Sequence, residues 1–273
     1  MKLRLFQVDA FTEEPFRGNP AAVCLLDDPR VEEWMLAVAV EMNLSETAFV
    51  LMGHGASPYE LPLRWFTPKV EVELCGHATL AAAHVLWETG ARDPEEPIRF
   101  ATASGILTCN VDRDETIWMD FPALPSEEID EPAGLADALG AAPVRVARNR
   151  HDHLVELADA VTVRELAPDF GAIAAIETRA VVVTALADGD DDVDEDVDFV
   201  SRCFGPRVGI DEDPVTGSAH CALGPWWAAR LARTELVGHQ VSARGGIVHV
   251  DVRDERVRIG GRAVTVLRGE LVE

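Results

Sequence analysis

Lysine and positive charge are what this sequence has least of. Its 273 residues contain 24 Lys and Arg against 48 Asp and Glu, which gives a formal net charge of −24. Only Lys2 and Lys69 are lysines, so nearly all of the positive charge is arginine. Binding to a nucleic-acid backbone or to an anionic membrane surface requires clustered basic residues. The charge therefore argues against nucleic-acid and membrane partners, and it fits either a high-GC genome or life in concentrated salt.

Long hydrophobic runs are also missing. No stretch of about 18 apolar residues marks a membrane span. The opening segment MKLRLFQVDAF has the alternation of a strand rather than the pattern of a signal peptide. With 48% hydrophobic and 26% charged residues the composition is typical of a globular protein. We expect a cytoplasmic protein with a sizeable core.

Paired cysteines and cofactor motifs are a third absence. The five cysteines are odd in number and none forms a CxxC pair, so we expect no disulfides and, with the exception of Cys75, small buried apolar residues. The sequence contains no P-loop, no GxGxxG after a strand and no GxSxG elbow. The triplet His151-Asp152-His153 has no further ligand cluster near it in sequence, which favours an exposed loop over a metal site. We therefore predict no cofactor and no metal.

The two halves of the chain resemble each other. Each has many short strands and one apolar helix, predicted over Cys75–Glu88 and Gly217–Leu231. Proline and glutamate are dense over 122–132, which is typical of a linker. We predict an α+β fold of two similar domains, 1–121 and 122–273, with central helices near 76–88 and 217–231. The last strands could instead pack back on the first domain.

The other elements are shorter, and their hydrophobic periodicity is weaker. Helical spacing favours helices over Val31–Met42 and Ala133–Leu139. The acidic stretch Asp188–Asp198 is typical of a solvated loop; a calcium site is the alternative, although the stretch lacks the spacing of a calcium loop. The expected strands are Leu3–Ala10, Ala21–Leu26, Thr47–Met52, Leu61–Phe66, Ile98–Ala101, Gly105–Val111, Thr116–Phe121, Val144–Ala147, Leu154–Leu157, Ala180–Ala185, Gly246–Val252, Val257–Gly260 and Ala263–Leu271.

Glycine opens both apolar helices, at Gly76 and Gly217. A helix start without a bulky side chain can bind an anion through its N–H groups and its dipole, although glycine there also permits close helix packing. Glu46 lies at the mouth of an apolar strand, where partial desolvation would raise its pKa toward the range of acid/base catalysis. His77 lies at a helix start, where its pKa would be lowered. Asp213 is a candidate either for helix entry or for proton transfer.

Six segments together resemble the phenazine-biosynthesis PhzF-like family of isomerases, which is related to diaminopimelate epimerase. They are Val8–Phe11, Phe16–Ala21, Asn43–Phe49, Arg64–Pro68, Glu73–Thr79 and Glu212–Ala219. The resemblance implies two domains, each a strand-rich barrel around a central helix, with an active site between them. It also implies a homodimer and cofactor-independent proton transfer on a small carboxylate-bearing molecule.

The same resemblance implies roles for individual residues. Glu46 would be the general acid/base, and His77 and Asp213 would assist it. The expected substrate-binding residues are Ser45, Gly76, Gly217, Ser218, Asn19 and Cys75.

One departure from the related epimerases bears on mechanism. Those enzymes use one cysteine at each helix start, whereas here Cys75 is matched by Thr216. Because a threonine hydroxyl is far less acidic than a thiol, a two-cysteine epimerisation is disfavoured. A racemase that uses Cys75 with another partner, and a binding protein without catalysis, remain alternatives to an isomerase that depends on Glu46.

Overall fold

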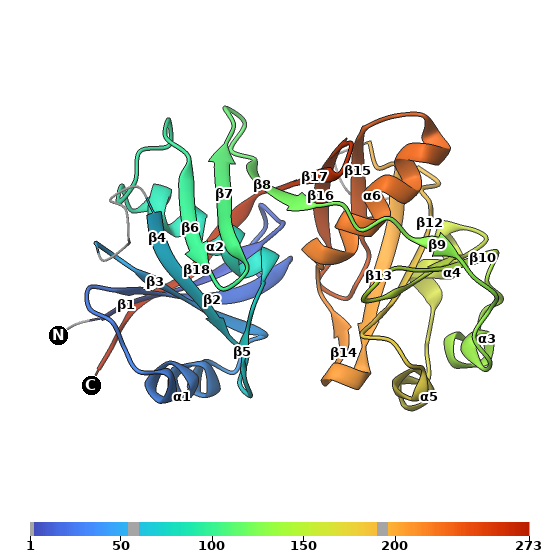
Figure 1. The fold of residues 1–273 in the computed structure, drawn as a ribbon, viewed down its shortest axis with the longest axis horizontal. Helices are drawn as coiled ribbons and strands as arrows, with labels where there is room; N and C mark the ends of the chain where they lie inside the picture. Colours follow the sequence, from blue (N-terminus) through green and yellow to red (C-terminus); the bar gives the residue numbers. More distant parts are fainter. Residues whose placement is uncertain (1–2, 54–59, 190–195, 273) are drawn as a thin grey trace. The chain divides into compact units, whose positions relative to one another are not determined.

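The computed structural model describes residues 3–53, 60–189 and 196–272 (Figure 1). Its contacts divide the chain into two units, Met1–Asp120 with Gly260–Glu273, and Phe121–Ile259. The sequence interpretation placed the boundary between residues 121 and 122 and left two placements open for the last strands. The contacts assign the final segment to the first unit, because its strand pairs there with the first strand of the chain.

The first unit is a strand-rich barrel with one central helix. Its strands are β1 (Leu3–Ala10), β2 (Asn19–Leu26), β3 (Glu46–Leu51), β4 (Glu60–Phe66), β5 (Glu71–Val72), β6 (Ile98–Thr102), β7 (Gly105–Val111), β8 (Ile117–Pro122, which runs into the second unit) and β18 (Ala263–Leu271); its helices are α1 (Glu32–Met42) and α2 (Gly76–Glu88). Strand β1 pairs with β18 and β2, and the ladder continues through β3, β4, β6 and β7 to β8. The β2–β3 and β4–β6 pairings are parallel and the others are antiparallel.

Helix α2 is central because it is apolar on nearly every side. Nine of its 13 residues are buried, and it packs against β1, β2, β3 and β18. Alanine at 78 and 81–83 keeps its surface narrow, so that the strands approach closely. Helix α1 packs against β3 and β4, and its residues Met35, Val38 and Ala39 share a core cluster with the inward-facing side chains of β2. Strand β2 is therefore buried along almost its whole length, which explains its unbroken apolar run.

The second unit repeats the scheme of strands with one long apolar helix. Its strands are β9 (Glu127–Glu128), β10 (Arg145–Arg148), β11 (His153–Glu156), β12 (Val181–Leu186), β13 (Phe199–Gly205), β14 (Ile210–Asp213), β15 (Glu235–Gln240), β16 (Gly246–Arg253) and β17 (Arg256–Gly261, which runs into the first unit); its helices are α3 (Leu135–Leu139), α4 (Ala160–Glu165), α5 (Phe170–Ala175), the 3₁₀ turn η1 (Pro206–Val208) and α6 (Gly217–Leu231). Strands β9 to β13 pair in chain order, β14 pairs with β13, and β15 joins β13 in parallel before pairing with β16.

Helix α6 lies close to β16 because of a glycine. A Cβ atom at Gly224 would come within 2.6 Å of the Val250 side chain, so only glycine permits this approach. Nine of the 15 residues of α6 are buried. The predicted bounds of α6 match the structure, and those of α2 differ only in that Cys75 precedes the first turn.

Several elements of the two units were not predicted. Helices α4 and α5 have only six residues each, too short to show a period, and they depend on capping by Asp159 and Asp169. Strands β5, β9, β13, β14 and β15 were also missed. Strand β13 carries the polar residues Ser201 and Arg202 in its interior, which breaks the apolar pattern although Ser201 is fully buried.

Two further expectations concern cysteines and the acidic stretch. All five cysteines are free and buried, which confirms the prediction made for those other than Cys75. In the acidic stretch, residues 190–195 lie outside the described residues, while Asp188 forms an ion pair with Arg164 at 2.8 Å.

Among the described residues, no helix combines the length and the apolar character needed to cross a membrane.

Candidate active site

The first group of predicted site residues gathers where two strands of the first unit begin. Strands β2 and β3 run parallel with Ala21 opposite Glu46, so Asn19 and Glu46 start at the same edge. Asn19 is fully buried, and the Glu46 side chain is 13% exposed. Ser45 is half-buried directly before Glu46. This edge therefore presents a carboxylate that is largely shielded from water.

The start of α2 brings two more predicted residues to Glu46. The His77 Nε2 atom lies 3.3 Å from Glu46 Oε2, and His77 Nδ1 lies 3.6 Å from the Sγ atom of Cys75. Cys75 is the residue before the first turn, and its side chain makes no capping hydrogen bond, while Gly76 begins the helix. A carboxylate, an imidazole and a thiol thus form one continuous group.

Burial determines the protonation of His77. Desolvation lowers its pKa from 6.5 to about 4, so the imidazole is neutral at pH 7. The sequence predicted a lowered pKa from the helix dipole, whereas burial is the cause found here. A neutral imidazole has one nitrogen that donates and one that accepts. His77 can therefore pass a proton between the Glu46 side and the Cys75 side.

The same three side chains are also the described residues best placed to hold a metal ion. One ligand atom from each of Glu46, Cys75 and His77 lies within 4.8 Å of the others. Carboxylate, thiolate and imidazole ligands are the types that zinc accepts. No metal site was predicted from the sequence, because Glu46 lies on a different element from Cys75 and His77 and the three residues share no ligand spacing.

A strained loop precedes Asn19 and was not assigned a role from sequence. Phe11, Phe16 and Gly18 all have φ between 62° and 72°, in the left-handed region. A Cβ atom at Gly18 would also collide with the carbonyl oxygen of Ala10. The buried Asp9 carboxylate accepts a hydrogen bond of 2.7 Å from the Phe16 N–H. This loop fixes the backbone that leads into Asn19, and in the sequence its segments Val8–Phe11 and Phe16–Ala21 stood out only by their resemblance to the family.

The second group of predicted residues lies in the second unit, at the start of α6. Asp213 ends β14, and its Oδ2 atom accepts a 2.5 Å hydrogen bond from the Thr216 hydroxyl. The buried Gln240 amide oxygen accepts from the Thr216 N–H at 2.8 Å, and its nitrogen donates to the Asp213 carbonyl at 2.7 Å. Gln240 was not predicted, because it lies 24 residues beyond Thr216 in sequence.

Ser218, in the first turn of the same helix, is held by an arginine that was also missed. Arg179 Nη2 donates to Ser218 Oγ at 3.2 Å, and Arg179 Nε donates to Asp152 Oδ1 at 2.8 Å. The sequence interpretation of 151–153 as an exposed loop is correct for His151 but wrong for Asp152 and His153, which are buried. Asp152 is buried because the Arg179 guanidinium satisfies both of its oxygens.

The predicted site residues therefore form two groups. Glu46, Cys75 and His77 are in contact within the first unit, where Ser45, Asn19 and Gly76 adjoin them in sequence or along the strand edge. Within the second unit, Asp213 contacts Thr216. Gly217 and Ser218 form the first turn that follows Thr216.

Comparison with known proteins places the chain in a family. A family model described as phenazine biosynthesis-like protein matches residues 8–269. An uncharacterized isomerase of Halalkalibacterium halodurans is 48% identical over 100% of this chain and 99% of its own length. A crystal structure of a PhzF-family phenazine biosynthesis protein from Enterococcus faecalis is 42% identical and covers all of both chains, with a TM-score of 0.92. A structure described as a predicted epimerase from Pseudomonas aeruginosa is 25% identical over 99% of both chains, with a TM-score of 0.71.

The fold is that of the isomerases and epimerases built as two strand-rich barrels. This chain belongs to the phenazine biosynthesis-like (PhzF) family.

Proposed function

We propose that the protein is a cofactor-independent isomerase that moves a proton, and with it a double bond, within a small carboxylate-bearing metabolite. The observation that supports this most is the Glu46 carboxylate, which is 13% exposed and lies 3.3 Å from a neutral imidazole. A shielded carboxylate beside a neutral proton carrier is suited to removing a proton from carbon and returning it.

In the proposed reaction Glu46 takes a proton from a carbon next to the double bond, the double bond shifts, and the same carboxyl returns the proton to a second atom. One proton leaves and one proton is added, so the step needs no oxidant or reductant. His77 would orient Glu46 and relay protons. The N–H groups at the start of α2 would bind the substrate carboxylate and stabilise developing negative charge.

The first experiment identifies a ligand and then tests Glu46. A thermal-shift screen of small amino and hydroxy acids supplies binders, and NMR in D₂O measures their isomerisation and deuterium uptake. Glu46→Gln should lower turnover by about 10²–10⁴-fold, the usual contribution of a general acid/base, with little change in ligand affinity. The exposed Glu41, changed to Gln, is the matched control and should keep full turnover. Undiminished turnover in Glu46→Gln would refute the proposal.

A second candidate is a racemase or epimerase that uses Cys75. The contact of 3.6 Å between Cys75 Sγ and His77 Nδ1 favours it, because an imidazole can accept the thiol proton. The second position is unfavourable, since the Thr216 hydroxyl donates its hydrogen bond to Asp213. Deuterium incorporation at a stereocentre that is lost in Cys75→Ala and kept in Glu46→Gln would favour this candidate. Stabilisation by ligands that are never converted would favour a binding protein.

A further inference from the structure

The first unit brings three different metal-binding side chains together at one place. Within the described parts of the chain, Glu46, Cys75 and His77 are the one group of His, Cys, Asp or Glu side chains with the spacing to hold a metal ion. Glu46 begins β3, whereas Cys75 and His77 lie at the first turn of α2. All three belong to the first unit, so the group is formed by that unit alone.

The separations between the ligand atoms are close to those around a tetrahedral zinc ion. Bonds of about 2.0–2.3 Å place two ligand atoms of such an ion about 3.3–3.6 Å apart. The His77 Nε2 atom lies 3.3 Å from Glu46 Oε2, and His77 Nδ1 lies 3.6 Å from Cys75 Sγ. One ion takes only one of the two nitrogens, so the most distant pair of ligand atoms, at up to 4.8 Å, has to close by about 1 Å. Rotation of the side chains can supply a movement of this size.

A buried nitrogen of His77 lacks a hydrogen-bond partner. The side chain is 8% exposed, and among the described residues no hydrogen bond is found for its Nε2 atom, although Glu46 Oε2 is near. A buried polar atom without a partner costs free energy, because its contacts with water are lost and not replaced. A cation bound between the imidazole and the carboxylate would satisfy both groups. The Glu46 side chain, which is 13% exposed, gives an ion access to the group.

Ligand type and overall charge indicate which ions fit this group. A thiolate and an imidazole suit Zn²⁺ and similar transition metals, whereas Mg²⁺ and Ca²⁺ take oxygen ligands. The net charge of −24 raises the concentration of cations near the surface of the protein. The same charge that repels an anionic substrate therefore favours capture of a divalent cation.

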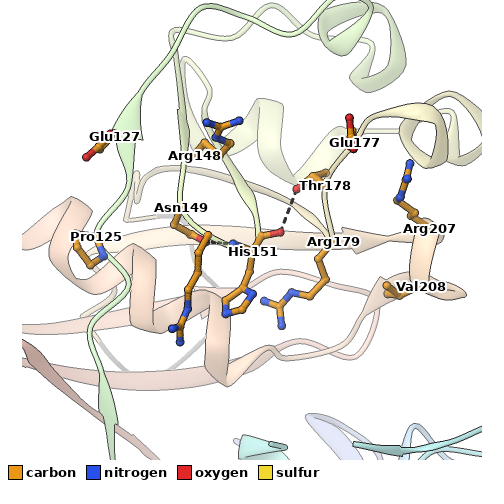
Figure 2. Close-up of a pocket in the computed structure, with 11 residues that line it drawn as sticks. Pro125, Glu127, Arg148, Asn149, His151, Glu177, Thr178, Arg179, Arg207 and Val208 are labelled. Carbon is orange, nitrogen blue, oxygen red and sulfur yellow. Dashed lines mark hydrogen bonds between the residues drawn. The ribbon is translucent and has the colours of Figure 1, made fainter. Parts of the chain in front are cut away.

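The histidine motif of the second unit, His151-Asp152-His153, has surroundings that repel a cation. His151 borders a pocket with four arginines among its lining residues, and Figure 2 shows the His151 ring and the Arg179 guanidinium on the same side of that pocket. Burial lowers the pKa of His151, and the charges of Arg179 and Arg150 lower it further, while Asp152 opposes them. Both Asp152 oxygens already accept hydrogen bonds from Arg179. The exposed His151 is therefore a suitable control for metal binding.

We propose that Glu46, Cys75 and His77 together bind one Zn²⁺ ion, or a divalent transition metal of similar chemistry, and that the bound ion inhibits the enzyme. On binding, the Cys75 S–H bond breaks, a sulfur–metal bond forms and the proton passes to the solvent, with no change of oxidation state. The ion occupies the Glu46 oxygen and the His77 nitrogen that proton transfer needs. Inhibition thus rests on the proposed function, whereas binding does not.

Titration with Co²⁺, a visible substitute for zinc, tests binding in the full chain without an affinity tag. We expect one bound ion per chain, with d–d bands in the visible range and a charge-transfer band in the near ultraviolet that a thiolate ligand produces. Zn²⁺, which has a filled d shell, should displace the cobalt and remove both bands. An excess of Mg²⁺ should leave both bands unchanged.

Variants identify the ligands. Cys75→Ser should abolish the charge-transfer band. Glu46→Gln and His77→Ala should each weaken Co²⁺ binding tenfold or more, since even the loss of a residue that only orients a metal ligand costs about 10–100-fold in affinity. His151→Gln and Glu41→Gln change exposed residues and are the matched controls, which should bind Co²⁺ as the wild type does.

Inhibition is measured separately, on a ligand that the thermal-shift screen identifies and the protein converts. One equivalent of Zn²⁺ should suppress its turnover, and EDTA should restore it. The metal site is overturned if no charge-transfer band forms, if the band persists in Cys75→Ser, or if His151→Gln weakens binding as much as His77→Ala does. Turnover that continues with zinc bound would overturn the inhibitory role. If no ligand is ever converted, the proposed function fails, while the cobalt titration still decides whether the metal site exists.

Discussion

Gln240 supports the start of α6, and its replacement by leucine is the most direct test of that role. The fully buried side chain makes three hydrogen bonds, one with the Thr216 N–H, one with the Asp213 carbonyl and one of 3.2 Å with the Thr216 hydroxyl. Leucine has a similar volume and makes none of them. The substitution therefore removes polar contacts without opening a large cavity.

The expected cost follows from the number of bonds. At about 0.5–1.5 kcal/mol for each hydrogen bond, the free energy of unfolding should fall by about 2–4 kcal/mol. With a urea slope of roughly 2 kcal/mol per molar, the unfolding midpoint of the second unit should shift down by about 1–2 M. Circular dichroism and tryptophan fluorescence during urea titration measure this shift, because Trp226 and Trp227 lie on α6.

The chain contains one other glutamine, which serves as the control. Gln7 is half-buried on β1, and no side-chain hydrogen bond is found for it among the described residues. Gln7→Leu should change stability by less than about 0.5 kcal/mol. If Gln240→Leu unfolds at the same urea concentration as the wild type, the three bonds do not stabilise α6 and the reasoning is refuted.

Two further predictions concern buried titratable groups. Burial lowers the pKa of His220 to about 4, so its neutral form stabilises the fold above the unfolded value of about 6.5, and this stabilisation is lost as the pH falls through the window between them. Going from pH 7 to pH 5 should therefore lower the free energy of unfolding by about 2 kcal/mol through this residue. Urea titrations of His220→Phe should lack this contribution. An equal pH dependence of stability in both proteins would contradict the prediction. Burial raises the pKa values of the Cys109 and Cys203 thiols far above the usual range, so iodoacetamide at pH 8 should leave both unmodified in the native protein and should modify both in urea, as mass spectrometry of peptides can show. Rapid native alkylation of either residue would mean that its surroundings open to solvent.

The sequence predicted best what depends on local pattern. Helix α2 has an apolar run too long for a strand, and its glycine start marks the first turn, so its bounds were found within one residue. The short helices α4 and α5 have no such pattern, since one aspartate cap is the main signal for each. Strand β15 ends in Gly-His-Gln, which interrupts the apolar alternation of a strand, so the strand that carries Gln240 was not predicted.

The candidate site was predictable only in part, for a related reason. Resemblance to the family pointed to Glu46 and His77, but no spacing rule could show that residues 31 positions apart would approach to 3.3 Å. That contact exists because β3 lies next to β2 in parallel and α2 packs across both strands. The link from Asp152 through Arg179 to Ser218 spans 66 positions and has no local signal at all. Such groups depend on strand pairing, which a single sequence does not specify.

Because the last strand of the chain pairs within the first unit, the sheet of that unit is completed only after the second unit has been synthesised. Residue Leu3 pairs opposite Leu271 and Ala10 opposite Ala263, so β1 is synthesised first but gains its β18 neighbour last. The second unit, Phe121–Ile259, is complete in the nascent chain before that neighbour exists. Contacts this distant in sequence close slowly, because a long loop must be ordered before they form. During translation the second unit can therefore mature while the barrel around α2, which carries Glu46 and His77, still has an open seam along β1.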